Sequence, residues 1–562
     1  MVTQDRKYFE RRRSQLELEK SSYIGLWRDE SDFIAPFSAR FLVTDRRQAG
    51  MKRATKILDN TASIAVGVLS AGLMSGVTNP TRPWIQMRMQ DPTLNKMQVV
   101  KAWLDDCKKV MMETFLKSNL YSVLPQVYAS LAVFGTATLS VMEHHERGIW
   151  AEHFPVGSYA LGRSGYGTID SIYRERQWSV WEMVERFGKD ACSAQVQSAF
   201  DAGNMDQLIT VIHAVEPNHE WDDGKLSSGF KKWLSVYYEN GQTEKDYLTR
   251  KGFDEFPILA PRWETVGEDT YGFGPGAMAL GDVKSLQTMD RRSLQAVDKK
   301  VTPAMVAPPA MRKKKISALS GDITYVEETA EGKGIREMYK VNLDIRELEM
   351  KAEQTRSRIK KAFYSDLFLL ISSLDKSGIT ATEIAARKEE QLLALGPVYL
   401  KLNDELLDPL VERTFSILLR QGKIPVPPAE IQGKPWTVEY ISVLSQSMKA
   451  VGVQNLERAV SFLGAVAQAD PSVLDGFSGD DAWEEYADMT AIAPRIVRDA
   501  ATRKRIRDQR AQADRAKQSM EMAQQGADVA QKLGNSPLGD NNALAQIVQR
   551  MQGAPALQGA PA

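Results

Sequence analysis

The stretch Ala381–Gln421 reads ATEIAARKEEQLLALGPVYLKLNDELLDPLVERTFSILLRQ. Its apolar side chains recur at spacings of three and four residues, which predicts one apolar stripe along a single long helix. A continuous helix of this length would extend about 60 Å, at about 1.5 Å per residue. Pro397 and Pro409 predict kinks, because each removes a backbone donor and crowds the preceding turn. The stripe consists of Ile384, Leu392, Leu395, Val398, Leu402, Leu406, Leu410 and Ile417.

The residues before this helix extend it into a hairpin. Residues 343–371 have a helical pattern, and residues 372–380 contain the polar, glycine-containing sequence SSLDKSGIT that is typical of a loop. Thr380 or Thr382 is placed to cap the helix that follows. About 80 residues therefore form a helical spine, and no reaction centre is evident in them.

Composition sets the outer bounds. The 562 residues are enough for several domains with apolar cores. Lys+Arg and Asp+Glu both number 72, and this balance weakens any prediction of a tight, sequence-independent nucleic-acid binder. Two cysteines, Cys107 and Cys192, are too few for a disulfide framework or a four-thiolate zinc site, which indicates a reducing compartment. The charged N-terminus has no apolar run after it, and the best membrane candidate, residues 64–77, is shorter than the roughly 20 residues of a span, so we expect no signal peptide and a soluble protein.

The first 270 residues predict helices interrupted by a small sheet. Helices are expected at residues 3–34, from a cap at 59–61 through Leu73, and over about 95–130. Glycine-separated β-rich runs between Ala132 and Tyr173 predict a small antiparallel sheet with a hairpin turn at 162–167. Helices are expected again at about 178–215, followed by a loop-rich part with scattered strands up to 270.

Prolines and glycines mark the boundaries of several predicted elements after residue 270. A helix is expected at about 278–300 after the turn-forming cluster YGFGPG at 271–276, with a stripe of Leu280, Val283, Leu286, Leu294 and Val297. Prolines interrupt 301–342, where residues 322–327 predict a strand. A strand is expected at 436–440, with helices at about 442–468, 481–489 and 495–533. Residues 534–562 are rich in Gly, Pro, Ala, Asn and Gln, which indicates mobility.

Several segments in this order resemble the head-to-tail connector, or portal, proteins of short-tailed bacteriophages. The resemblance covers about residues 20–520. None of these segments is a catalytic motif, but their order and spacing together are specific. They are WRDESDFIAPF (27–37), LDNTASIAVGVLSAGLMSGVTNPTRPW (58–84), VFGTATLSV (133–141), YGFGPGAMALGDVKSLQTMD (271–290) and TATEIAARKEEQLLALGPVYLKLNDELLDPLVERTF (380–415).

The resemblance implies a mainly α fold with small β elements, of the portal type. It also implies a homo-oligomeric ring, a dodecamer, at one capsid vertex of the virion, assembled in the host cytoplasm. Double-stranded DNA would pass through the ring during packaging and ejection. The implied partners are terminase, a tail adaptor, and the major capsid and scaffolding proteins, with no membrane, cofactor, metal or enzymatic activity. The implied regions are a wing (1–270), a first stem helix (271–300), a clip (301–342), a second stem helix (343–371), a channel loop (372–380), a spine that returns to the wing (381–440), a helical crown (441–533) and a flexible tail (534–562).

Local clusters of basic residues are the candidate contacts of this implied function. Near-zero net charge suits passage without trapping, because each phosphate contact adds about one unit to the salt dependence of binding. Each cluster also has a plainer interpretation: a solvated loop pair for Asp375 and Lys376, a solubilising run for the clip residues, or an exposed face of a helical bundle for the crown residues. The candidates are Asp375, Lys376, Lys299 and Lys300 for the DNA channel, Arg312, Lys313, Lys314 and Lys315 for clip docking or DNA, and Arg503, Lys504, Arg505 and Arg507 for DNA in the crown.

Enzymatic alternatives lack a site in the sequence. No G-x-x-x-x-G-K-[ST] occurs, so an ATP-driven motor must be a separate protein. The histidines at 144, 145 and 153 lie near Glu143 and Glu152, but H-E-x-x-H is absent, and adjacent residues on a strand would point to opposite faces. No G-x-S-x-G occurs either. The alternative to a portal is therefore a helical scaffold or adaptor of a virion that conducts no DNA.

Overall fold

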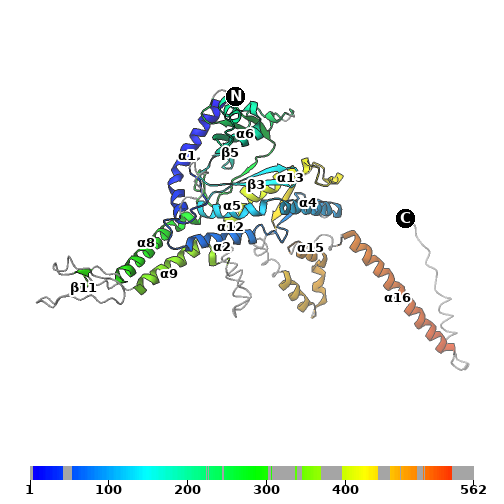
Figure 1. The fold of residues 1–562 in the computed structure, drawn as a ribbon. Helices are drawn as coiled ribbons and strands as arrows, with labels where there is room; N and C mark the ends of the chain where they lie inside the picture. The colour runs from blue at the N-terminus through cyan, green and yellow to red at the C-terminus, as the bar shows by residue number, and fades with distance from the viewer. Residues whose placement is uncertain are drawn as a thin grey trace, which may run out of the picture. The chain divides into compact units, whose positions relative to one another are not determined.

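The computed structural model describes residues 4–41, 54–95, 97–222, 224–225, 227–242, 246–301, 305–306, 336–337, 345–366, 368, 395–433, 435–440, 456–468, 470–489, 498 and 500–534. Its contacts divide into two compact units. The first contains Met1–Asn95 and Val99–Ala491, and the second contains Lys96–Gln98 and Ile492–Ala562. The fold is mainly α with small antiparallel sheets, as predicted (Figure 1).

Helix α1 (Arg6–Phe33) connects two cores of the first unit. The Asp5 carboxylate accepts a hydrogen bond from the Tyr8 backbone N–H at 2.8 Å and caps the helix. Phe9 near its start packs on the five-stranded sheet, while Trp27 near its end belongs to the main core. The other N-terminal helices are α2 (Thr61–Gly76), α3 (Pro92–Asn95), α4 (Gln98–Lys117) and α5 (Leu120–Phe134).

The largest sheet has five antiparallel strands in the order β4-β5-β6-β7-β8. The predicted hairpin turn is confirmed between β4 and β5, where the Ser164 N–H donates to the Thr168 carbonyl at 2.8 Å. The prediction of helix throughout 178–215 is wrong: α6 (Val180–Phe187) and α7 (Ala194–Asp201) are short, and Leu208–Pro217 is strand β6. The β-branched run in β6 pairs with both neighbouring strands along its length. The strands are β4 (Tyr159–Arg163), β5 (Ile169–Ser179), β6, β7 (Trp233–Glu239) and β8 (Thr249–Phe253).

Three smaller sheets complete the β structure. One has the order β3-β2-β9, from β2 (Thr138–His144), β3 (Gly148–Phe154) and β9 (Ile258–Leu259). In the second, β1 (Ile85–Met89) pairs antiparallel with the predicted strand at 436–440, β12 (Trp436–Tyr440). In the third, β10 (Met305–Val306) pairs with β11 (Arg336–Glu337). The predicted strand at 322–327 lies outside the described residues.

Helix α2 packs closely in the core. It lies against α5 and α9. A Cβ on Gly72 would lie 2.2 Å from Cγ of Phe368, so only glycine fits there without movement of that ring. None of the helices that the structure describes is both long and apolar enough to cross a bilayer.

Helices α8 (Pro275–Val301) and α9 (Ile345–Ala362) run side by side, as Figure 1 shows. The predicted helix at 278–300 is confirmed. The prediction of one continuous helix over 343–371 is wrong: α9 ends at Ala362, Tyr364 has a positive φ of 54°, and residues 365, 366 and 368 are helical again. Such a conformation is unfavourable for a residue with a side chain and interrupts helical geometry. Residues 369–371, like the predicted loop 372–380, lie outside the described residues.

The long predicted helix is described from Leu395 onward. It consists of α12 (Gly396–Leu402), a π-helical turn (Asn403–Leu407) and α13 (Asp408–Arg420). Pro397 lies in the first turn of α12, where a missing N–H costs nothing. The kink predicted at this residue stays a prediction, because the chain just before Leu395 is not described. Residues 381–394 lie outside the described residues.

The C-terminal helices belong to two units. Residues 456–467 are helical, and α15 (Gly479–Met489) corresponds to the helix predicted at 481–489. In the second unit, α16 (Ala500–Gly534) corresponds to the helix predicted at about 495–533. Residues 535–562 lie outside the described residues. Short 3₁₀ turns occur at Lys189–Ala191, Ser228–Phe230, Ala429–Ile431 and Pro471–Gly476.

Candidate functional site

The base of the α8–α9 pair is fixed to the main core by backbone contact. Gly135, which ends α5, has φ +67°, and Gly274 and Gly276 pack against the end of the same helix. A Cβ on Gly276 would lie 2.1 Å from the carbonyl oxygen of Val133. The glycines of the YGFGPG cluster therefore allow α8 to start directly on α5, as a turn rather than a nucleotide-binding loop.

A buried polar cluster joins the two helices to the start of α2. The Gln287 side-chain oxygen accepts hydrogen bonds from the N–H groups of Leu58 at 2.6 Å and Asp59 at 2.9 Å, and its amide donates to the Asp59 carbonyl at 2.8 Å. Arg356 of α9 donates to the Asp59 carboxylate at 2.8 Å and lies 3.6 Å from Asp290 of α8. Every atom of Gln287 that can hydrogen-bond is thereby used, although the residue is only 3% exposed.

The electrostatics of this cluster favour the charged forms of Asp59 and Arg356, whereas burial and the nearby charge of Asp59 raise the pKa of Asp290. Burial opposes ionisation of Asp59, but hydrogen bonds from Thr61 and Arg356 outweigh it and hold the pKa of Asp59 below its ordinary value. The hydrogen bond to Asp59 likewise raises the pKa of Arg356. A second pair, between Arg358 and Asp282 at 2.9 Å, joins α9 to α8 on a more exposed face.

Sequence reasoning missed this cluster. The one available signal was Gln287 itself, a polar residue at the seventh position after Leu280 on the apolar stripe. A polar side chain in a core register must find partners, but the sequence does not say which ones.

The far half of α8 is exposed in the single chain. Leu280, Val283 and Leu286 of the predicted stripe are buried, whereas Leu294 is 62% and Val297 43% exposed. The candidate residues Lys299 and Lys300 lie in the last turn of α8, both exposed. Their charges are favourable there, because a helix C-terminus carries partial negative charge. The other candidates for the channel, Asp375 and Lys376, and those for the clip, Arg312–Lys315, lie outside the described residues.

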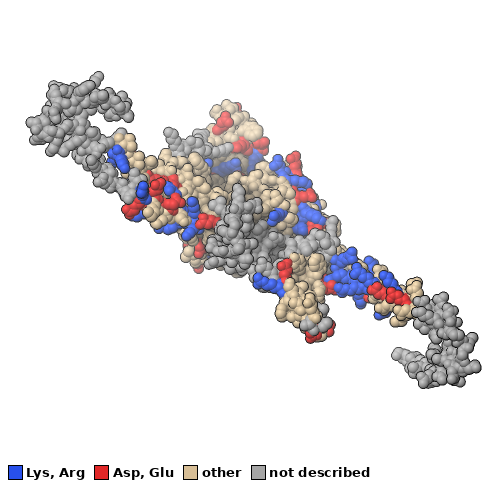
Figure 2. All heavy atoms as spheres, turned by 90° about the horizontal axis from the view of Figure 1, so that it is seen from below, with Lys and Arg blue, Asp and Glu red and all other residues tan. Residues whose placement is uncertain are grey.

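Helix α16 carries the remaining candidates. The segment 503–517 has seven basic and two acidic residues, a net charge of +5. Lys504, Arg505 and Arg507 are exposed and Arg503 is half-buried. Figure 2 shows Lys and Arg side chains gathered along this helix. The structure thus brings these four residues together on one helix.

Comparison with known proteins decides the family. Residues 6–497 match the family described as bacteriophage head to tail connecting protein. A "Probable portal protein" of Bordetella phage BPP-1 is 40% identical over 98% of this chain and 99% of its own length. The chain belongs to the family of bacteriophage head-to-tail connecting proteins.

Two further relatives of this connector chain are named portal proteins. One, from Salmonella phage epsilon15, is 40% identical over 95% of this chain and 96% of its own length. Another, from Enterobacteria phage T3, is 26% identical over 66% of each chain. The similarity to the first two relatives spans both units described above.

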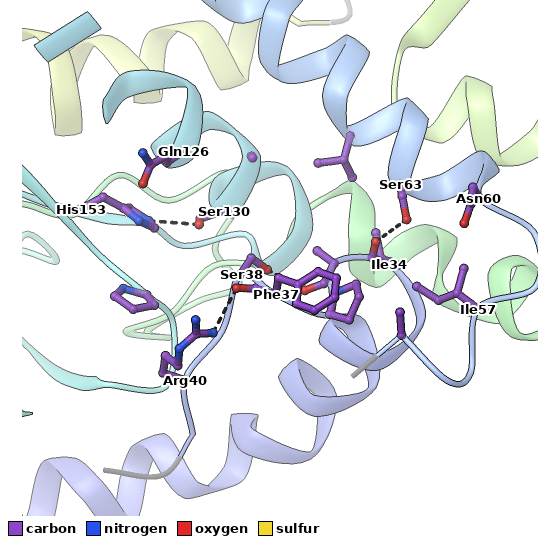
Figure 3. A pocket seen from close by; sticks show the side chains of 16 residues that line it. Ile34, Phe37, Ser38, Arg40, Ile57, Asn60, Ser63, Gln126, Ser130 and His153 are labelled. Carbon is purple, nitrogen blue, oxygen red and sulfur yellow. Dashed lines mark hydrogen bonds between the residues drawn. The ribbon is translucent and has the colours of Figure 1, made fainter. Parts of the chain in front are cut away.

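The connector chain also contains an open pocket of about 740 Å³ between the segment that follows α1 and the elements α2, α5 and β3 (Figure 3). His153, Gln126 and Ser130 gather at one end of it, and Ile57 and Asn60 lie at the other. His153 Nε2 lies 3.0 Å from Ser130 Oγ, and burial lowers the pKa of His153 to about 4, so the ring is neutral at pH 7. The pocket walls are mostly apolar, and this Ser–His contact joins a helix to the neighbouring strand.

The histidine pair at 144 and 145 and the two cysteines lie in separate places in the fold. The expectation that His144 and His145 point to opposite faces of a strand is wrong: β2 ends at His144 and the two rings stack with centroids 5.1 Å apart. No group of three His, Cys, Asp or Glu side chains in the described ranges is placed to hold a metal ion. Cys107 and Cys192 are buried and form no disulfide with each other; the Cys192 thiol donates to the Gly188 carbonyl at 3.3 Å, and burial raises the pKa of Cys107 to about 12.

Proposed function

We propose that this chain is the portal subunit of a bacteriophage, and that its copies form a ring at one capsid vertex. The ring is the channel for double-stranded DNA in packaging and ejection, and it docks the terminase motor and then the tail. The observation that carries the proposal is the match to the connector family over residues 6–497, together with 40% identity to named portal proteins over nearly the whole chain. The protein works without cofactor and without catalysis of its own.

The structural elements support a division of labour within the subunit. Helices α8 and α9 form the stem, residues 301–342 the clip, and residues 372–380 the loop that projects into the channel. Residues 1–270 form the wing, the helix that ends at Arg420 is the spine that returns to it through β12, and residues 441–533 form the crown. A stem helix in a ring has a neighbour on each side, which accounts for apolar side chains such as Leu294 and Val297 that are exposed in the single chain.

DNA contacts in such a channel are few and local. Lys299 and Lys300 of the stem, Asp375 and Lys376 of the channel loop, Arg312–Lys315 of the clip and Arg503–Arg507 of the crown are the proposed contacts. A net charge of zero over the whole chain keeps the total affinity for phosphate low, so that DNA slides instead of being trapped. The basic helix α16 is the strongest of these contacts, because its charge of +5 within 503–517 is the largest local excess among them.

The direct test is the assembly state of the purified protein, measured by native mass spectrometry and by projection images in negative stain. We expect a closed ring of about twelve copies with a central hole wider than duplex DNA, about 20 Å. Assembly is measured with and without scaffolding protein, since a portal can require it. A chain that stays monomeric with scaffolding protein present, or forms a compact dimer, would instead support a virion scaffold or adaptor that conducts no DNA.

A further inference from the structure

The helix between Gly396 and Arg420 contains one turn of different pitch. Asn403–Leu407 is π-helical, and the Asp408 N–H donates to the Asn403 carbonyl five residues earlier instead of four. A π turn holds one residue more than the α-helix on either side of it. Such turns are rare and often occur where a helix must change shape.

Pro409 explains why the wide turn lies here. In a regular α-helix, residue 409 would donate its N–H to the carbonyl of Glu405, but proline has no N–H, and its ring crowds that carbonyl. A wider turn moves the ring and the carbonyl apart. The sequence therefore weakens the α-helical form at this turn without forbidding it, since prolines are tolerated in kinked helices.

One ion pair holds the side chain of the π turn. The Glu405 carboxylate accepts from the Arg262 backbone N–H at 2.8 Å, from its Nε at 3.1 Å and from its Nη2 at 2.6 Å. The two side chains are only 17% and 6% exposed. Arg262 Nη2 also donates to the Gly167 carbonyl at 2.8 Å, in the turn between β4 and β5. A buried arginine left without its carboxylate is strongly unfavourable, so this pair favours the form of the helix that presents Glu405 to Arg262.

A second contact lies one turn earlier on the same helix. Lys401 Nζ donates to Thr265 Oγ1 at 2.6 Å, close in sequence to Arg262. The segment Arg262–Thr265 therefore contacts the helix at two points, through Lys401 of α12 and through Glu405 of the π turn.

We propose that the π turn Asn403–Leu407 is a register switch in the long helix, held in its π form by the pair Arg262–Glu405. In the other form the turn is α-helical and Gly396–Leu402 rotates by about 100° and shifts by about 1.5 Å along the axis, the step of one residue. Glu405 then leaves Arg262, and Lys401 leaves Thr265. The switch gives Gly396–Leu402 two discrete positions relative to Arg262–Thr265, and it does not depend on the proposed portal function.

The test is hydrogen exchange, measured by mass spectrometry on the full-length protein, in peptides that cover residues 396–408. Glu405→Gln should remove the charge that holds Arg262 and speed exchange of these amides at least tenfold, because the segment now opens between two forms. Asp404→Asn is the matched control: it removes the same charge from the same turn, but Asp404 is exposed, so exchange should stay at the wild-type rate.

A deletion separates a switch from simple damage. Removal of Asn403 takes away the extra residue and makes the helix α throughout, with the flanking segments in their original orientation. Combined with Glu405→Gln, it should return exchange to the slow rate. Unchanged exchange in Glu405→Gln, or a uniform increase over the whole chain, would overturn the proposal. If the deletion variant does not fold, faster exchange confined to residues 396–408 in Glu405→Gln supports the switch, whereas an unchanged rate or an increase spread over the chain overturns it.

Discussion

The two halves of the α8–α9 pair differ in what surrounds them. Near α2 and α5, Val283 and Gln287 are buried, Gly276 touches backbone, and Arg356 reaches Asp59 and Asp290. Toward Val301, the same helix exposes apolar and charged side chains alike. One continuous helix thus serves as core at one end and as surface at the other. Substitutions in the half near α2 and α5 should change the free energy of unfolding. Substitutions in the half toward Val301 should leave it nearly unchanged and affect only binding to other molecules.

The largest effect is expected for Gly276→Ala. The new Cβ would lie 2.1 Å from a backbone oxygen, and backbone cannot move aside cheaply, so we expect a loss of about 3 kcal/mol or more. The measurement is the shift of the denaturation midpoint. Gly281→Ala is the control in the same helix, where no atom lies within 4 Å; it should be neutral or stabilise by up to about 1 kcal/mol. Equal midpoints for the two variants would contradict the close contact.

Glu30→Gln should stabilise the same end in a pH-dependent way. Glu30 is fully buried, neither carboxylate oxygen has a partner among the described residues, and burial with the charge of Asp29 raises its pKa to about 9. Between pH 4.5 and 9 the unfolded chain loses this proton and the folded chain keeps it, so Glu30 lowers stability progressively as the pH rises. The gain should grow with pH by no more than about 1.4 kcal/mol per pH unit, from almost none at pH 4 to about 2 kcal/mol or more at pH 8.

The control for this prediction is Asp32→Asn, which removes an exposed carboxylate beside Lys56. It should give no gain that grows with pH. A pH-independent gain for Glu30→Gln would mean that the carboxyl group is already ionised in the folded protein.

Arg356→Ala should have an intermediate effect. Its loss leaves the buried Asp59 without its cation, but Arg356 is itself 26% exposed, so we expect about 1.5 kcal/mol. The difference from wild type should vanish in acid, because Asp59 has a lowered pKa and its contribution is lost as the pH falls through it. Thermal midpoints at pH 7 and at a series of values descending from pH 4 provide the measurement, and the difference should shrink along that series. Lys351→Ala, which breaks an exposed i,i+4 pair in the other half, should cost less than about 0.5 kcal/mol.

The smallest effect on stability is expected for the double variant Lys299→Glu and Lys300→Glu. Both residues are exposed, so the midpoint should move by less than about 0.5 kcal/mol. DNA retention or docking in assembled particles should change and should depend on salt, since charge contacts are screened. The neutral variant Lys299→Gln with Lys300→Gln should show a smaller change. A large loss of stability would place these lysines in a folded contact and remove the contrast between the two halves.

Sequence alone predicted the elements well where periodicity was strong. The helices of Pro275–Val301 and Ala500–Gly534 were expected within a few residues, and so was the strand at Trp436–Tyr440. Strand β6 was missed even though its sequence, LITVIHAVEP, is rich in β-branched residues, because the flanking helical patterns were extended across it. The end of α9 at Ala362 was missed because no proline or glycine marks it there.

The polar contacts were beyond sequence reasoning for a different reason. Asp59 meets Arg356 across 297 residues, and Arg262 meets Glu405 across 143. Each residue alone looks like one of many surface charges in a chain with 72 basic and 72 acidic residues. The packing of α2, α8 and α9 brings Asp59 to Arg356. The π-helical turn places Glu405 against Arg262. Lys299 and Lys300 could be placed from sequence because a position at a helix end requires no long-range information.

The pairing of β1 with β12 has a consequence for synthesis. Met89 lies opposite Trp436, so a ribosome that has completed β1 must add 347 more residues before its partner strand exists. At roughly 5–20 residues per second this takes about 17–70 s. During that time β1 is an open strand edge, a template for pairing with another nascent chain. Fragments that stop before residue 436 should therefore aggregate more readily than the full chain, because their β1 never receives its partner strand.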